Sequence, residues 1–575
     1  MTKTYEKNKV LTGAQIFIQC LIQEGVKEIF GYPGGVILPI YEELYHTKEV
    51  KHYLVRHEQG ALHAAEGYAR VTGKPGVALV TSGPGACNAI TGITNAYYDG
   101  YPLVVFTGQV ALSLIGNDAF QEADIVGITN ACTKHNYLVK DVKDLPRIIK
   151  EAFHIATTGK PGPVVVDLPK DVLTSKTEFV YPDKVKLPGY NPTYTGHPVQ
   201  IAKALELLYK AERPVVIAGG GVIASEASEE LTKLAKILNI PVVNTLMGSG
   251  AFPGTDELAL GMLGMHGNYW SNIAVSNCDV LFAVGTRFSD RVTGKLDKFC
   301  AEAKKIHIDI DPCSISKNIP VDIPIVGDAK QVLTEMLNSL NEEEAGKNLE
   351  KKHFWMNKIS EWRQKKVKPT VKSEKLSPQV VIEKIYEYTK DKDAIIATEV
   401  GQHQMWTAQL YKFDKPRRFV SSGGLGTMGF GFPAAMGAQV AFPDRLVINV
   451  AGDGSIQMNI QELATCVRYN IPVKICIINN GYLGMVRQWQ EKLFNENYSE
   501  TIMTGPDYVK LADAYGAKGF SVTKEEEITP VLEQALNING PVIIDFHVEP
   551  FEIVYPWVLA GDPICKVLLG DNCME

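Results

Sequence analysis

The sequence has no Cys-x-x-Cys pair, although ten cysteines are scattered from Cys20 to Cys573. Such dispersed cysteines suit thiols in a reducing compartment better than a disulfide framework or a zinc site. Long apolar runs are also missing, since the longest, around residues 214–224, is interrupted by three glycines. That run falls far short of the ~20 apolar residues that cross a bilayer. We therefore expect no membrane span.

Positive charge is in deficit as well. The chain has 58 Lys and Arg against 65 Asp and Glu, a net charge of −7, without long blocks of one sign. Proteins that bind polyanions are usually basic, so nucleic acid is not an expected partner. The first thirteen residues contain no apolar signal core and already include an acidic residue, Glu6. The sequence thus predicts a soluble, cytoplasmic protein.

Short apolar, β-branched runs recur along the chain, each followed by a Gly-rich or polar turn and a helix-like segment. Because these runs do not alternate with polar residues, they indicate strands buried on both faces, as in parallel sheets covered by helices. The clearest runs cover residues 77–81, 103–107, 164–167, 215–218, 280–284, 446–450, 473–478 and 542–546. The predicted fold class is α/β, built from doubly wound parallel-sheet domains.

Two stretches that look like linkers divide the chain. Residues 181–198 are rich in Pro, Gly and Tyr, and residues 341–375 are highly charged without a strand-like run. They predict domains at 1–185, 195–345 and 375–555, followed by a tail at 556–575. The outer two domains each close with a Gly-Pro-led strand that ends in aspartate, at Gly162–Asp167 and Gly540–Asp545. This match indicates that the first and third domains are related copies.

Two turn motifs follow buried strands in the third domain. Gly452-Asp453-Gly454 follows the run at 446–450, and Asn479-Asn480 follows the run at 473–478. Ligands of open parallel sheets bind outside the carboxyl ends of the strands. Glycine lets the backbone approach a phosphate, and Asp453 and Asn480 offer the oxygen ligands that magnesium prefers. Either motif alone is a common turn, but the pair predicts a site for a phosphate and a metal.

Together these motifs resemble the signature of thiamin-diphosphate-dependent enzymes. The resemblance implies that a magnesium ion is held on the diphosphate by Asp453, the side chain of Asn480 and the backbone carbonyl of Tyr482. It places further residues around the cofactor in this domain: Gln402, His403, Gly452, Gly454, Ser455 and Met485.

The resemblance extends to the first domain. Glu58, in the stretch Arg56–Ala61, matches the family's catalytic glutamate, which bonds N1′ of the aminopyrimidine. Burial in an apolar cleft favours the neutral form of a carboxyl group, which suits proton exchange with N1′. The alternative is a helix N-terminal glutamate stabilised by the helix dipole. Pro84 and Asn88, after the run at 77–81, fit the same aminopyrimidine site.

Met428 lies in the Gly-rich segment 423–433. By the resemblance it is the bulky apolar residue that props the cofactor in a bent form. A methionine is more often plain core, but the surrounding glycines favour a close ligand.

The whole chain resembles the catalytic subunit of acetohydroxyacid synthase (acetolactate synthase). The stretches that carry this resemblance are 30–35, 118–122, 167–172, 264–267, 287–294 and 484–489. It implies that pyruvate is decarboxylated and that its hydroxyethyl unit is ligated to pyruvate or 2-ketobutyrate. The products would be 2-acetolactate and 2-aceto-2-hydroxybutyrate, for valine, leucine and isoleucine biosynthesis.

The same resemblance assigns residues to the substrates. Arg291 would clasp the carboxylate of the second 2-keto acid, and Trp489 would contact the ethyl group of 2-ketobutyrate. Gly35, Gln121 and Lys170 would line the same cleft. The plainer interpretation is that Lys170 and Arg291 are surface cations and that Trp489 is a core residue.

The middle domain resembles the family's FAD-binding domain. Gly219-Gly220-Gly221 is only a weak dinucleotide hint, because a full G-x-G-x-x-G is missing. The flavin contacts implied by the resemblance are Lys160, Thr245, His266, Arg287, Asp309 and Asp328. Since the ligation involves no net redox change, the flavin would be structural. Departures from the family pattern at Ala111, Glu399 and residues 556–559 leave inhibitor sensitivity and closure of the C-terminal lid open.

Three other functions compete with this interpretation: a FAD-linked pyruvate oxidase, a catabolic flavin-free acetolactate synthase, and a nucleotide-binding scaffold without catalysis. The complete 287–294 motif argues against both enzymes, and the 484–489 motif further argues against the oxidase. Retention of Glu58, Asp453 and Asn480 argues against the scaffold. The resemblance implies small-molecule 2-keto acid substrates, a homodimer or homotetramer with sites between chains, and a separate small regulatory subunit.

Overall fold

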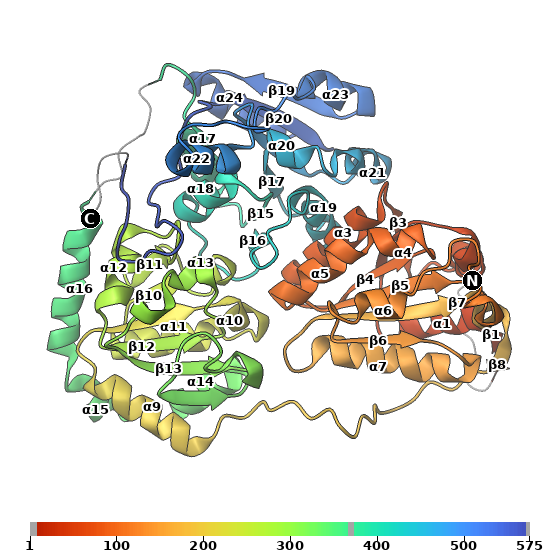
Figure 1. Cartoon of the computed structure of the whole chain (residues 1–575), viewed down its shortest axis with the longest axis horizontal. Helices are drawn as coiled ribbons and strands as arrows, with labels where there is room; N and C mark the ends of the chain where they lie inside the picture. The colour runs from red at the N-terminus through yellow and green to blue at the C-terminus, as the bar shows by residue number, and fades with distance from the viewer. Residues whose placement is uncertain (1–8, 366–372, 571–575) are drawn as a thin grey trace.

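A computed structural model of the chain describes residues 9–365 and 373–570. It contains three six-stranded sheets whose ladders are parallel, packed with helices (Figure 1). Alternate residues of a strand enter different cores: Ala78 and Val80 pack in one cluster, Val77 and Leu79 in another. Sheets buried on both faces are what continuous apolar runs predict, and the α/β fold class is confirmed.

The first sheet has the strand order β3 (Lys51–Leu54), β2 (Glu28–Gly31), β4 (Gly76–Val80), β5 (Leu103–Gln109), β7 (Pro163–Pro169) and β6 (His135–Leu138). Its helices are α1 (Gly13–Gln23), α2 (Leu38–His46), α3 (Glu58–Thr72), α4 (Pro84–Asn88), α5 (Ile90–Asp99), α6 (Ile125–Thr129), α7 (Leu145–Thr157) and α8 (Lys170–Thr174). A small antiparallel ribbon pairs β1 (Val10–Thr12) with β8 (Lys176–Glu178).

The third sheet has the strand order β16 (Phe419–Val420), β15 (Ile395–Thr398), β17 (Val447–Gly452), β18 (Lys474–Asn479), β20 (Val542–His547) and β19 (Lys518–Val522). Its helices are α17 (Pro378–Thr389), α18 (Gln402–Leu410), α19 (Gly431–Ala441), α20 (Asp453–Ile456), α21 (Leu463–Tyr469), α22 (Gly484–Leu493), α23 (Tyr508–Tyr515) and α24 (Glu525–Leu536).

Counted within each domain, the first and third sheets have the same order: second, first, third, fourth, sixth, fifth strand. The two Gly-Pro-led strands, β7 and β20, occupy the same place in this order. The two domains therefore are copies of one topology, as the paired strands predict.

The middle sheet has the strand order β11 (Ala259–Met262), β10 (Val242–Asn244), β9 (Pro214–Ala218), β12 (Val280–Val284), β13 (Lys304–Asp309) and β14 (Ile323–Val326). Its helices are α9 (Pro198–Lys210), α10 (Gly220–Ala224), α11 (Ser228–Leu238), α12 (Tyr269–Asn277), α13 (Asp290–Thr293), α14 (Ala329–Asn338), α15 (Glu342–Gly346) and α16 (Leu349–Arg363). Within the domain the order is 3-2-1-4-5-6, that of dinucleotide-binding folds, which hold ligands where β9 and β12 diverge.

Helices α3 and α19 join the first domain to the third along their length. A Cβ on Gly67 of α3 would overlap the carbonyl oxygen of Ala434, and one on Gly437 of α19 would overlap that of Ala64. Both crossings therefore need glycine, because the two backbones are in contact. One hydrophobic core runs through the pair and includes Ala61, Phe430 and strand residues of both sheets.

The two predicted linkers differ. Residues 181–198 lie between β8 and α9 and form an extended connection along one edge of the molecule (Figure 1). The charged stretch 341–375, also predicted as a linker, contains α15 and α16, and these helices pack against the middle domain. The reason is two apolar residues one turn apart, Trp355 and Ile359, which bury on the core beneath β9 and β12. Residues 366–372 lie outside the described ranges.

The C-terminal tail folds back onto the middle domain. Val558, Val567 and Leu569 pack with Tyr269 of α12, and Trp557 is fully buried. In the described part of the chain, every helix is too short or too polar to cross a membrane.

Candidate active site

A cavity of about 640 Å³ lies among the three domains and extends along the carboxyl edge of the middle sheet. It is lined from the first domain by the end of α5 and from the third by the start of α18 and by α22. All six residues predicted to contact a flavin line it: Lys160, Thr245, His266, Arg287, Asp309 and Asp328.

Glycines shape the wall of this cavity between β9 and β12. A Cβ on Gly221 would lie 2.6 Å from the Cα of Gly285, which itself has a φ of +59°. The two turns therefore touch backbone to backbone, and Gly220 and Gly221 border the cavity. A cradle without side chains at the diverging strands of this fold fits a dinucleotide such as FAD.

The charged side chains on the flavin side are mostly paired. Arg287 Nη1 donates to the carbonyl oxygen of Tyr98 at 3.0 Å, and Lys160 lies 3.5 Å from Asp311. Burial lowers the pKa of His266 to about 4, so its imidazole is neutral near pH 7. Asp328 caps α14 by accepting from the backbone N–H of Gln331, which accounts for an aspartate there without a ligand.

The same cavity is lined by two residues predicted beside the cofactor, Met428 and Met485, and by two predicted for the second substrate, Arg291 and Trp489. The side chain of Arg291 is 61% exposed and pairs with Asp290 at 2.8 Å, so its remaining N–H groups are free to meet a carboxylate. Trp489 packs edge-on against Trp557 of the tail, with ring centroids 5.5 Å apart. The tail therefore supports the indole from behind.

The metal motif lies at the carboxyl ends of two neighbouring strands. β17 and β18 pair in register through Gly452 and Ile478, so the turns after them adjoin. Asn480 Oδ1 accepts from the backbone N–H of Tyr482 at 3.0 Å. Burial raises the pKa of Asp453 to about 6, a cost that a bound cation would offset.

The surroundings of the motif fit a phosphorylated cofactor and a cation. Asn480 Nδ2 donates to Gln402 Oε1 at 3.1 Å. His403 is buried, its Nε2 has no protein partner, and burial lowers its pKa to about 3. A Cβ on Gly452 would lie 3.0 Å from Cε1 and Nδ1 of that imidazole, so a side chain at this position would crowd the ring. An unpartnered buried nitrogen beside a Gly-Asp-Gly turn fits a phosphate oxygen or its proton.

The described residues contain no group of three or more His, Cys, Asp or Glu that could hold a metal. A cation at this edge therefore needs Asp453 with amide or carbonyl oxygens, and ligand oxygens besides. That donor set suits Mg²⁺, which keeps several non-protein ligands and is commonly held through a substrate's phosphates.

The predicted first-domain residues form a separate cluster at the carboxyl edge of their own sheet. Asn88 Nδ2 donates to Glu58 Oε2 at 3.0 Å, and a Cβ on Gly85 would lie 3.3 Å from Glu58 Oε1. Gln121 has a φ of +60° and packs its backbone against the turn at Gly83.

Gly35 begins a short 3₁₀ turn after β2, exposed Pro84 begins α4, and exposed Lys170 begins α8 after β7. Glu58 and the other predicted first-domain residues do not line the cavity that contains Met428; Lys160, predicted for the flavin, does. The predicted metal ligands Asp453, Asn480 and Tyr482 do not line it either, so within one chain this cavity contains only the flavin and substrate residues of the predicted site, with Met428 and Met485 beside them.

Two buried glutamates near the site were not predicted. Glu399 accepts from the backbone N–H groups of Gly429 and Phe432, at 2.7 and 2.8 Å. Glu462 accepts from the backbone N–H groups of Arg56 and His57, which directly precede Glu58. Burial raises the pKa of each carboxyl to about 7. Their signal in the sequence is weak, because each looks like an ordinary helix-flanking acid.

Comparison with known proteins agrees along the whole chain. Residues 11–128, 201–336 and 399–546 match the N-terminal TPP binding, central, and C-terminal TPP binding domains of thiamine pyrophosphate enzymes. The chain is 52% identical over 570 residues to the acetolactate synthase isozyme 3 large subunit of Escherichia coli, covering 98% of this chain and 99% of that protein.

More distant organisms give similar matches. The chain is 50% identical to an acetolactate synthase of Mycobacterium bovis, over 96% of this chain and 90% of that protein. It is 49% identical to a probable acetolactate synthase large subunit of Methanocaldococcus jannaschii, over 97% and 95%. Both domain copies and the middle domain are thus accounted for, and the chain belongs to the acetolactate synthase large subunits, a family of thiamine pyrophosphate enzymes.

Proposed function

We propose that this chain is the catalytic subunit of an acetolactate synthase, which joins the two-carbon unit left after decarboxylation of pyruvate to a second 2-keto acid. The observation that carries this is the position of α22. Its first turn follows the predicted metal ligand Tyr482, and it brings Met485 and Trp489 to the cavity that Arg291 also lines. One helix thereby links the phosphate edge to a place for a second substrate.

Thiamin diphosphate is the cofactor that both outer domains match, and when bound it supplies the electron sink for decarboxylation. Asp453, Asn480 and the carbonyl of Tyr482 would hold Mg²⁺ on its diphosphate, beside Gln402 and His403. The backbone of Gly454 and the hydroxyl of Ser455 would contact the same phosphates. Supporting this, the side chains of Gln402 and Asn480 already bond each other at that edge.

Glu58 would hold and return the proton at N1′ of the aminopyrimidine, with Asn88 orienting its carboxylate. Met428 would support the bound cofactor from the cavity side. Arg291 would bind the carboxylate of the second 2-keto acid, and Trp489 would contact its alkyl group. A pocket distinguishes one methylene by only ~1–3 kcal/mol, so both pyruvate and 2-ketobutyrate would be accepted.

FAD would occupy the middle-domain end of the cavity, against Thr245, His266 and Arg287. Gly220 and Gly221 leave the room for it. Since the ligation transfers no net electrons, the flavin's contribution would be structural. The assignment would be supported if the purified protein is yellow and the Arg287→Ala variant loses this colour. A colourless but active enzyme would refute it.

The working unit would be a dimer with sites between chains. Support comes from the separation of Glu58 from the cavity within one chain, since a two-fold axis can pair the first-domain cluster of one chain with the third-domain edge of its partner. Dimers could pair further into tetramers, and a small regulatory subunit would bind elsewhere. The dispersed thiols favour the cytoplasm as the location.

The direct test is acetolactate formation from pyruvate with thiamin diphosphate, Mg²⁺ and FAD, without oxygen or another electron acceptor. Product under these conditions also excludes a pyruvate oxidase. Assembly is tested by mixing Glu58→Ala and Asp453→Ala chains, each inactive alone. Verified heterodimers should regain activity, because one site then carries both lesions and the other neither; heterodimers without activity would show that each site belongs to one chain.

A further inference from the structure

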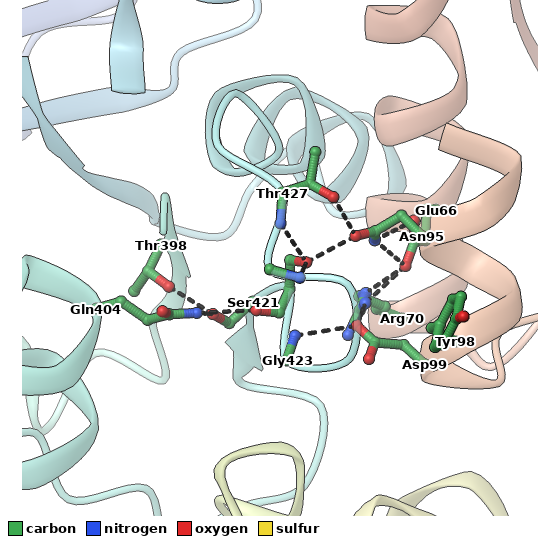
Figure 2. A network of polar contacts seen from close by, with 12 residues as sticks. Glu66, Arg70, Asn95, Tyr98, Asp99, Thr398, Gln404, Ser421, Gly423 and Thr427 are labelled. Carbon is green, nitrogen blue, oxygen red and sulfur yellow. Dashed lines mark hydrogen bonds and ion pairs between the residues drawn. The ribbon is translucent and has the colours of Figure 1, made fainter. Parts of the chain in front are cut away.

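We propose that Asn95 and Asp99, two residues of α5 in the first domain, are positioning residues for the segment 422–428 of the third domain. The proposal rests on the proposed role of Met428 beside the cofactor. Neither residue is expected to touch substrate; both would act by fixing where the segment holds Met428. Figure 2 shows the contacts, with the first-domain helices on one side and the segment on the other.

Asn95 holds the segment through its amide oxygen. Oδ1 accepts from the hydroxyl of Ser422 at 2.6 Å and from the hydroxyl of Thr427 at 2.8 Å. Ser422 Oγ in turn accepts from the backbone N–H of Thr427 at 2.9 Å (Figure 2). One oxygen of the first domain therefore closes a loop that ends one residue before Met428.

Asp99 holds the beginning of the same segment. Its Oδ2 accepts from the backbone N–H of Gly423 at 3.2 Å. Its Oδ1 lies 2.6 Å from where a Cβ on Gly424 would be, with Arg287 Nη2 at 2.7 Å from that point. Three domains therefore meet at Gly424, where a side chain has no room.

The two positioning residues are themselves fixed by a buried ion cluster. Asn95 Nδ2 donates to both carboxylate oxygens of Glu66, at 3.0 and 2.8 Å. Arg70 bonds Glu66 and Asp99, and all three side chains are at most 1% exposed. The Arg70 guanidinium also lies over the rings of Tyr101 and Phe430. Arg70 Nη1 and Asp99 Oδ1 are left without a hydrogen-bond partner, but the bonds that are made hold Asn95 Oδ1 and Asp99 Oδ2 toward the segment.

Neither interdomain packing nor stability explains why so many polar groups are buried at this junction. Interdomain packing is already provided by the apolar crossing of α3 and α19, which needs no charge. Burying an ion cluster is a poor route to stability, because desolvation offsets the attraction. The polar groups converge instead on one segment, and Glu399 bonds Gly429, the residue that follows it. Met428 therefore lies between two anchored neighbours, Thr427 and Gly429, which is the arrangement that positioning requires.

The test uses shape-conserving changes at the junction. Thr427→Val removes the hydroxyl that bonds Asn95 and keeps its volume, Thr427→Ser keeps the hydroxyl, and Asn95→Ala removes the acceptor itself. Thr389→Val is the matched control. Thr389 also has a buried hydroxyl in the third domain, but its partner is the hydroxyl of Tyr411, at 2.9 Å, and neither residue belongs to the segment. For each we would measure kcat, the KM for pyruvate, thiamin diphosphate affinity by calorimetry, and Tm.

We expect Thr427→Val to lower kcat by about tenfold with little change in cofactor affinity, because small misplacements of a reacting geometry slow chemistry. Thr427→Ser should retain most of the rate, and Thr389→Val should change only Tm. In a Met428→Ala background the Thr427→Val effect on kcat should shrink below about twofold, since residues that act through one another are non-additive. Asn95→Ala should follow the same pattern if it folds.

Two results would overturn the proposal and can be told apart. If Met428→Ala alone leaves kcat unchanged, the proposed role of Met428 fails and the positioning proposal fails with it. If Met428→Ala is slow while Thr427→Val is normal, or the two effects multiply, only the positioning proposal fails.

Discussion

The first and third domains repeat one strand order, and the repeat reaches individual side chains. In the first, Asp167 on β7 pairs in register with Thr107 and accepts from the amide of Gln109, two residues further along β5. In the third, Asp545 on β20 pairs with Ile477 and accepts from Asn479, again two residues further along β18. Both aspartates are buried at the same point of the fold.

The turns beyond these strands differ. After Asn479 the third domain continues with Asn480, and the neighbouring strand ends in Gly452 and Asp453, which gives a hard oxygen edge. After Gln109 the first domain continues with Val110 and Ala111, so it offers no such edge, and its proposed catalytic residue is Glu58, which begins α3. A shared sheet thus decides where ligands approach, while the turn residues decide which chemistry occurs there.

The largest expected effect comes from a change in the first-domain half of the proposed active site. Glu58→Gln keeps the volume and the bond from Asn88 but cannot hold a proton for N1′. Acid–base assistance contributes ~10²–10⁴-fold, and kcat should fall by that factor. Calorimetry should show nearly unchanged thiamin diphosphate affinity, because the phosphate edge is intact. Activity within a few-fold of wild type would remove Glu58 from the mechanism.

The next largest effect comes from a change in the third-domain half of the proposed active site. Asp453→Ala should weaken Mg²⁺ and thiamin diphosphate together, at least about tenfold, since altering even an outer partner of a metal commonly costs ~10–100-fold in affinity. The unfolding free energy of the cofactor-free protein should not fall, because the buried carboxylate is destabilising, as its raised pKa of about 6 indicates. Calorimetry with each cofactor and denaturant unfolding without them provide the two measurements. Unchanged affinity for both would contradict the assignment.

The sequence predicts the parts of the molecule that depend on local pattern. Continuous apolar runs identify the central strands, such as Val280–Val284, and the Gly-Asp-Gly turn marks the carboxyl end of β17, where we propose the metal site. Short edge strands such as β16, with two residues, have no comparable pattern. Asn95 and Asp99 could not be found from the sequence, because their bonds to Gly423 and Thr427 exist only where domains far apart in the chain meet.

A smaller effect concerns α22, which carries the proposed substrate contact Trp489 and begins two residues after the proposed metal ligand Tyr482. Trp489→Leu shortens the apolar wall that Trp557 supports. Competition between the two acceptors should then show the preference for 2-ketobutyrate over pyruvate reduced by up to about tenfold, since one methylene is worth ~1–3 kcal/mol. Turnover with pyruvate alone is the control and should remain. A wild-type product ratio would make Trp489 a core residue only.

The smallest expected effect is a difference in titration between the two equivalent aspartates, Asp167 and Asp545, which have different polar partners. Burial raises the pKa of Asp167 to about 7, with the Thr107 and Gln109 bonds opposing the shift. Burial also raises the pKa of Asp545, but the bond from Asn479 and His547, 3.3 Å away, oppose this rise.

For a carboxyl whose pKa is raised on folding, the stability contribution is complete below the unfolded pKa of ~3.9 and is lost as pH rises through the folded value. Folding should therefore take up a proton at Asp167 between about pH 4 and pH 7, and Asp167→Asn should abolish that uptake. In a difference titration of the folded proteins, Asp167→Asn should remove about one group titrating near pH 7, and Asp545→Asn should remove one group whose pKa is raised above the usual aspartate value. Identical difference curves would mean that the two domain copies also share their electrostatics, and that only their turns have diverged.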